Sequence, residues 1–144
     1  MNSWSKNLEL LIKSRTSLIW IRTKEEERLH KILNQSCKRL NIKRFVSWDC
    51  INGLKGVLNE KGKFSNNPLG ALNWIKEETS LLPTLLLLKD FDKFYNDPSI
   101  NRTIKELSSS LRETNNNLIL CSHLLPSSEE LDDLITIINL PCLL

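Results

Sequence analysis

Polar side chains that could do chemistry follow four apolar segments of the chain. Listed with the segment each one follows, they are Thr23 after LIWIR, Asp49 after RFVSW, Asp90 and Asp92 after TLLLLK, and Ser122 and His123 after LILC. If these segments are parallel strands, ligands bind beyond their carboxyl ends, where the strand order reverses. These residues are therefore the constellation in the sequence that best indicates a functional site.

The segment TLLLLKDF has the form of a Walker B motif, in which an apolar strand ends in an acid that holds Mg²⁺. A nucleotide site also needs the glycine-rich pattern G-x-x-x-x-G-K-[ST] after the first strand. The chain has IRTKEEER there, residues 21–28, without glycine and with three carboxylates that would repel a triphosphate. The stretch GVLNEKGKF, residues 56–64, has one residue too many between its glycines and Phe64 at the Ser/Thr position. The sequence therefore predicts that the phosphate loop is missing.

Catalysis is not indicated either. Hydrolysis of ATP at such a site needs a Glu next to the metal-binding Asp, and Phe91 stands there instead. Asp92 would point away from Asp90, because side chains alternate along a strand. The four cysteines form no C-x-x-C pair and the chain has 2 histidines, so no metal site is indicated. We expect no catalytic residue, no metal and no cofactor, and thus no enzymatic activity of this chain.

Hydrophobic periodicity predicts the elements that would position these residues. A leading helix within residues 1–15 is followed by the strands SLIWI, RFVSWDC, TLLLLKDFD, LILCS and LITIINL, with helices between them. The helix starts are indicated by a capping box at Thr23–Glu26, by Asn67-Pro68, by Asp97-Pro98 and, for a short helix, by Ser127-Ser128. Residues 52–66 are predicted to be a loop or a loose hairpin.

This alternation of strands and helices predicts one domain over residues 1–144. Its expected architecture is a three-layer α/β fold, with about five mostly parallel strands and helices on both faces. That is the form of a degenerate P-loop NTPase-like domain. Apolar residues from Leu140 to Leu144 are expected to be exposed and to suit docking to another domain.

Charge and composition restrict the partners. The net charge is +3, but residues 1–63 carry 14 basic and 6 acidic residues, whereas residues 64–144 carry 6 and 11. The basic residues are interspersed with Glu25, Glu26 and Glu27, which is typical of solvated helix faces, so we expect no nucleic-acid partner. No stretch approaches about 18 apolar residues and the first residues do not form a signal peptide, which predicts a cytoplasmic protein without a membrane span.

Five segments together resemble one family. SLIWIRTKEEERLHKIL, SWDCINGL, NPLGALNWIKE, TLLLLKDF and NLILCSHLLPSSEEL are similar, in this order, to the N-terminal domain of the AAA+ ATPase-like proteins of cyanobacteria and plastid genomes. The resemblance covers nearly the whole chain. It implies a degenerate AAA-like domain in which Asp90 matches the Walker B acid and Ser122 the sensor-1 position. It also implies a working ATPase domain beyond Leu144 in such proteins, and a role related to photosynthesis or inorganic-carbon uptake.

Several functions stay open on these residues. The first is a non-catalytic domain that binds a protein partner or regulates an ATPase domain. The second is a receiver-like phospho-acceptor domain using Asp90 and Ser122, which lacks an acidic pair after the first strand. Weak binding of ATP and Mg²⁺ without turnover is a third, and a Mg²⁺-dependent nuclease or phosphatase using Asp49, Asp90 and Asp92 is a fourth.

Overall fold

The computed structural model of the chain describes residues 2–16, 18–56, 67–77, 82–125 and 133–142. The short helix expected after Ser127 lies outside these ranges. In chain order, the elements are α1 (Ser3–Lys13), β1 (Leu18–Arg22), α2 (Glu26–Arg39), β2 (Arg44–Asp49), β3 (Gly53–Lys55), α3 (Pro68–Glu77), β4 (Thr84–Leu88), the 3₁₀ turn η1 (Phe91–Lys93), α4 (Pro98–Ser110), the 3₁₀ turn η2 (Leu111–Glu113), β5 (Asn116–Ser122) and β6 (Ile135–Asn139).

The strands form one sheet in the order β3-β2-β4-β5-β1-β6. The five predicted strands are all present, and they pair in parallel with one another, as expected. The sixth, β3, pairs antiparallel with β2 and lies in the segment expected to be a loop or loose hairpin. The position directly after β3 requires glycine, because Gly56 has a φ of +100° and a Cβ there would lie 2.7 Å from the Phe45 carbonyl oxygen.

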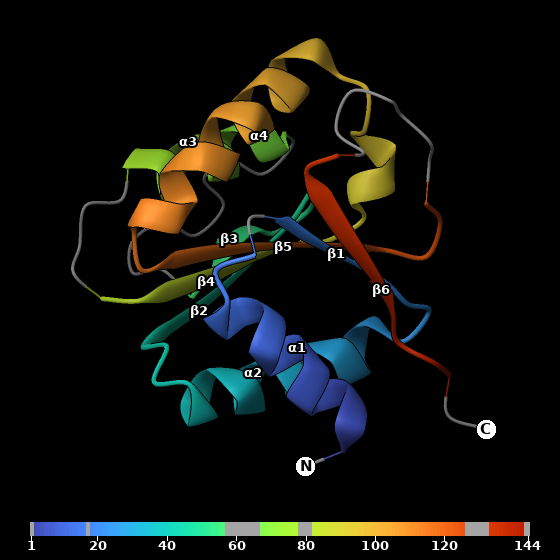
Figure 1. Cartoon of the computed structure of the whole chain (residues 1–144). Coiled ribbons are helices and arrows are strands. Elements are labelled where there is room, and N and C mark those ends of the chain that lie inside the picture. Colours follow the sequence, from blue (N-terminus) through green and yellow to red (C-terminus); the bar gives the residue numbers. More distant parts are fainter. Residues whose placement is uncertain (1, 17, 57–66, 78–81, 126–132, 143–144) are drawn as a thin grey trace.

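Helices cover both faces of the sheet. In Figure 1, α1 and α2 lie against one face, and α3 and α4 against the other. Because side chains alternate along each strand, the core divides into two clusters. Leu18 and Trp20 of β1 pack under α3 and α4, whereas Ile19 and Ile21 pack under α1 and α2. The three-layer α/β architecture expected from the sequence is confirmed.

The topology gives the sheet two chemically different ends. The carboxyl ends of β1, β5 and β4 are adjacent, since β5 pairs with both of the other strands. At the opposite end these strands begin, and there α1 and α2 end at Lys13 and Arg39, directly before the segments that lead into β1 and β2. No helix among the described residues is long and apolar enough to cross a membrane.

The prediction that the apolar residues from Leu140 to Leu144 are exposed is wrong for Leu140. Leu140 is 4% exposed and packs in the cluster under α1 and α2. The cause is continuation of the sheet ladder, because the Leu140 N–H donates to the Arg22 carbonyl at 2.9 Å. Leu143 and Leu144 lie outside the described residues.

Candidate functional site

Four residues singled out from the sequence meet at the carboxyl end of the sheet. Thr23, Asp90, Ser122 and His123 all line one open pocket of about 400 Å³. The pocket is completed by three further residues, Lys24, Glu26 and Cys121. Asp49 and Asp92 are not among its lining residues. The parallel sheet thus places the strand-end residues of β1, β4 and β5 together, as the switch-point rule implies.

The Ser122 hydroxyl is already engaged in the core. It accepts a hydrogen bond from the Trp20 indole Nε1 at 2.8 Å and donates to the Leu124 carbonyl. Ser122 itself is 4% exposed. Since both the donor and one acceptor position of the hydroxyl are used, a ligand in the pocket would have to break an internal bond to engage the hydroxyl proton.

Phe91, which stands where a catalytic Glu would be, belongs to the core rather than to the pocket. Its side chain is fully buried and its ring meets Trp20 edge to face, with the centroids 5.5 Å apart. Tyr95 stacks on the same Trp20 at 5.1 Å. The three aromatic rings close the sheet from the side of α3 and α4, so this position packs the fold.

Asp90 follows β4 in a left-handed conformation, with φ at 55° and ψ at 38°. Non-glycine residues adopt this region at a cost, although Asp tolerates it better than most. The Asp90 carbonyl accepts from the Lys93 N–H at 3.1 Å, which forms the turn η1, and the Asp90 N–H donates to the Cys121 thiol. The Asp90 side chain is exposed.

The turn between β1 and α2 is closed by its own side chains. The Thr23 N–H extends the ladder to the Ser122 carbonyl at 2.9 Å, and the Thr23 hydroxyl accepts from the Glu25 N–H at 2.9 Å. The expected capping box is wrong in detail, because α2 begins at Glu26 and its cap residue, Glu25, makes no side-chain capping bond. Thr23 forms a tight turn before the helix instead of capping its first amides.

Carboxylates occupy the electrostatic position that a phosphate would need. Glu26 and Glu27 lie in the first turn of α2, where negative charge is stabilised by the helix dipole. Glu26 also lies 3.6 Å from Lys89 Nζ, and Glu25 pairs with Arg28 at 2.8 Å. A phosphate at this helix terminus would compete with the protein's own anions.

The pocket offers no evident nucleophile or metal-ligand set. Burial, together with the negative charges of Glu26 and Asp90, raises the pKa of the Cys121 thiol to about 12, so the thiol stays protonated at neutral pH. No group of three or more His, Cys, Asp or Glu side chains suited to a metal ion occurs in the part of the chain that the structure describes. Asp49, the third carboxylate of the nuclease alternative, is held in the β2–β3 turn by the N–H groups of Ile51 and Asn52.

Sequence reasoning missed three of the pocket residues and the Trp20–Ser122 bond. Lys24, Glu26 and Cys121 flank the predicted positions in the chain, so the signal available was proximity alone. The bond joins residues 102 positions apart, and it becomes visible only when β1 and β5 are known to be neighbours.

A solved structure shares the three-layer α/β fold of this chain. The chain is similar to a structure of PCH-2 from C. elegans, with a TM-score of 0.56 and 15% sequence identity, over 97% of this chain and 41% of that one. At this level of identity the likeness concerns the fold.

Sequence relatives identify the family. The profile of the SpoVK-like AAA ATPase N-terminal domain matches residues 4–140. The AAA domain-containing protein ycf46 of Guillardia theta is 36% identical over 139 residues, and its counterpart in Trieres chinensis is 37% identical over 140 residues. The chain therefore belongs to the SpoVK-like AAA ATPase N-terminal domain family, which confirms the resemblance seen in its sequence. It spans 28% of the length of each of these two relatives.

Proposed function

We propose that this domain is non-catalytic and acts through protein contacts, regulating the ATPase region that follows it in AAA-type proteins. The observation that supports this proposal best is the turn after β1. It holds Thr23 to Arg28, with three carboxylates and no glycine, where a phosphate loop would lie. The engaged Ser122 hydroxyl and the buried Phe91 ring favour the same conclusion, because neither is free to act on a bound nucleotide.

The receiver-like alternative finds less support. Phosphorylation of a carboxylate needs a bound Mg²⁺ held by a further pair of acids, and Glu26 is the one other carboxylate that lines the pocket around Asp90 among the described residues. Weak binding of ATP and Mg²⁺ without turnover remains the second candidate. It is favoured by the open pocket of about 400 Å³ and by Lys24 on its wall.

Titration with ATP and Mg²⁺ tests the absence of nucleotide function. We expect calorimetry to give no binding tighter than about 10 µM, which corresponds to about −7 kcal/mol. Asp90→Asn and Thr23→Ala are matched controls on the pocket and should leave the titration unchanged. Tighter binding, or ATP turnover that Asp90→Asn abolishes, would refute the proposal.

A second experiment tests the regulatory part. In the Guillardia theta relative, deleting the region aligned with this chain should change the rate of ATP turnover, and the isolated domain added back should bind the remainder. An unchanged rate together with no binding would contradict a regulatory contact. A role related to photosynthesis is a further proposal that rests on the sequence resemblance, and a cytoplasmic location is one that rests on the sequence pattern alone.

A further inference from the structure

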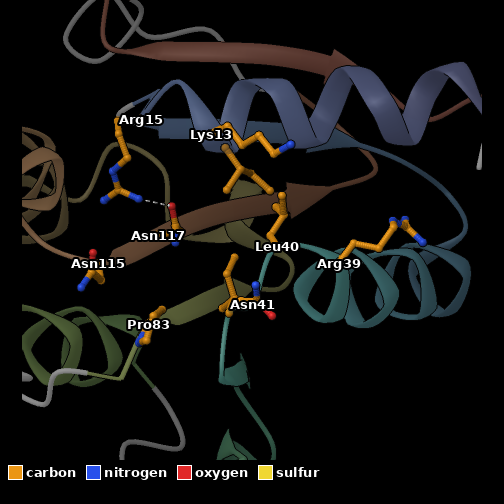
Figure 2. Close-up of a pocket in the computed structure, with 10 residues that line it drawn as sticks. Lys13, Arg15, Arg39, Leu40, Asn41, Pro83, Asn115 and Asn117 are labelled. Atoms are coloured by element: carbon orange, nitrogen blue, oxygen red, sulfur yellow. Dashed lines mark hydrogen bonds between the residues drawn. The ribbon is translucent and has the colours of Figure 1, made fainter.

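A second pocket lies at the opposite end of the sheet from the strand-end residues. It has a volume of about 390 Å³ and lies between the ends of α1 and α2 and the segments that lead into β4 and β5. Figure 2 shows this pocket, with Arg15 turned toward Asn117 and a hydrogen bond between the two. Its polar walls consist of three cations and three amides, namely Lys13, Arg15, Arg39, Asn41, Asn115 and Asn117.

The charged side chains that line this pocket are all basic. None of the described residues that line it is Asp or Glu. Arg39 has a carboxylate partner that does not line the pocket, because its guanidinium donates to the Glu9 carboxylate at 2.7 and 2.9 Å. Burial raises the pKa of Glu9, but hydrogen bonds from Arg39 and Ser36 and the charges of Arg39 and Lys13 lower it by more, so Glu9 is ionised at neutral pH. With Glu9 offsetting Arg39, the charges of Lys13 and Arg15 are left over.

Arg15 is held rigidly by neutral groups. Its guanidinium donates to the Asn117 side-chain oxygen at 2.7 Å and to the carbonyls of Leu111, Thr114 and Asn116 at 2.5, 2.6 and 2.8 Å. Partial burial lowers the pKa of Arg15, although not enough to discharge a guanidinium. The result is a half-buried, preorganised cation whose four hydrogen-bond partners are all uncharged, and such a cation favours an anion nearby.

Helix dipoles explain only part of this cluster. Lys13 and Arg39 lie in the last turns of α1 and α2, where cations are stabilised by the helix dipole. Arg15 lies beyond the end of α1, at a φ of 59°.

The backbone carbonyls at the ends of α1 and α2 are mostly hydrogen-bonded already. The terminal carbonyls of α1 accept from the N–H groups of residues 14–16, and those of α2 accept from the N–H groups of residues 40–42. An anion in the pocket therefore faces amides and cations more than unpaired helix carbonyls.

We propose that this pocket binds the phosphate group of a small anion through Lys13 and Arg15, with the side-chain amide of Asn41 beside them. The excess of two positive charges matches a phosphate dianion, whereas a single carboxylate would offset only half of it. The site lies at the amino ends of the strands, so it is independent of nucleotide binding at the carboxyl ends.

Calorimetry with inorganic phosphate tests the proposal, with potassium chloride of equal ionic strength as the reference. We expect saturable binding of one phosphate per chain. Lys13→Gln should weaken binding roughly tenfold, the loss of one charge-assisted contact. Lys6→Gln is the matched control, because it removes the same charge from the same helix without touching the pocket. Arg15 is not the variant of choice, since its carbonyl contacts also hold the fold.

The outcomes of these titrations show where the anion binds and whether it is free phosphate or a phosphate ester. A response no larger than with chloride, or equal losses in Lys6→Gln and Lys13→Gln, would overturn the proposal, because net charge alone would then explain the binding. Loss of binding in Lys24→Gln but not in Lys13→Gln would also overturn it, since the anion would then lie at the carboxyl ends. Repeating the titration with glycerol 2-phosphate distinguishes the source. Tighter binding of the ester supports a phosphorylated metabolite, and equal or weaker binding supports free phosphate in the same site.

Discussion

The two ends of this sheet reverse the arrangement expected of a parallel α/β domain. At the carboxyl ends, the residues that could hold a ligand bind one another: Ser122 bonds Trp20, Thr23 bonds the Glu25 amide, and Glu26 approaches Lys89. At the amino ends, Arg15 is fixed by three backbone carbonyls and the Asn117 side-chain oxygen, and Lys13 has no carboxylate among the lining residues. One end is internally satisfied and the other keeps an excess of positive charge. A fold can thus keep the geometry of a ligand site while its own side chains take the places of the ligand.

The largest expected effect comes from restoring an acid next to Asp90. Phe91→Glu should lower the free energy of unfolding by about 4 kcal/mol, because it removes a buried ring and places a charge among apolar groups. Urea denaturation at pH 7 measures this loss. Phe91→Leu, which keeps an apolar side chain, should cost less than half as much. If Phe91→Glu unfolded at the same urea concentration as the wild type, position 91 would face the pocket, and the contrast between the two ends would fail.

Replacing Arg15 should give the next largest loss of stability, and it tests how firmly this side chain holds the amino end of the sheet together. Arg15→Gln should lower the free energy of unfolding by about 3 kcal/mol, because three backbone carbonyls lose a charged donor. Arg15→Lys keeps the charge but not the planar fork, and should recover less than half of the loss. Full recovery by Lys would mean that charge alone matters at this site. Both variants are compared in urea without phosphate.

The predictability of the molecule differs between its elements. The five parallel strands were predicted correctly, because apolar runs such as TLLLL have few other uses than a buried strand. The segment of β3 was predicted only as a loop or loose hairpin, because three residues that begin with Gly53 and are followed by Gly56 give almost no periodic signal. Leu140 was predicted to be exposed, although strand pairing with Arg22 buries it.

The two pockets also differ in how far the sequence predicts them. Convergence of Thr23, Asp90 and Ser122 follows from strand direction, so the sequence was enough to predict it. The amino-end pocket could not be predicted, because its residues come from the ends of α1 and α2, the segments that lead into β1, β2, β4 and β5, and the start of β5, and none belongs to a motif. Its key feature, the set of carbonyls around Arg15, lies about 100 residues away in the chain, as the separations of 96, 99 and 101 show.

The Trp20–Ser122 bond is expected to have a smaller effect and tests whether the carboxyl end is internally satisfied. Ser122→Ala should lower the free energy of unfolding by about 1.5 kcal/mol, since it leaves a buried indole N–H without its acceptor. Trp20→Phe removes the donor, and the double variant should lose less than the sum of the two single losses. Strict additivity in this double-mutant cycle would show that the two groups do not depend on each other.

The smallest effect concerns His30, which can report which end of the sheet an anion occupies. Burial lowers the pKa of His30 below its ordinary value of 6.5, and the charges of Lys89 and Lys55 lower it further. Its Nδ1 is buried and has no hydrogen-bond partner among the described residues. Because the folded pKa lies below the unfolded one, the neutral ring favours folding above pH 6.5. This contribution is lost as the pH falls from 6.5 through the folded pKa.

Titration of His30 by NMR should therefore distinguish the two ends of the sheet. Phosphate bound at Lys13 and Arg15 should leave the His30 pKa unchanged, because Lys89, whose charge lowers it most, follows β4 at the opposite end. Phosphate bound near Lys89 would offset that lysine and raise the His30 pKa, as Lys89→Gln should do in the positive control. A rise of the pKa with phosphate, equal to that in Lys89→Gln, would show that the carboxyl end still accepts an anion despite its own carboxylates.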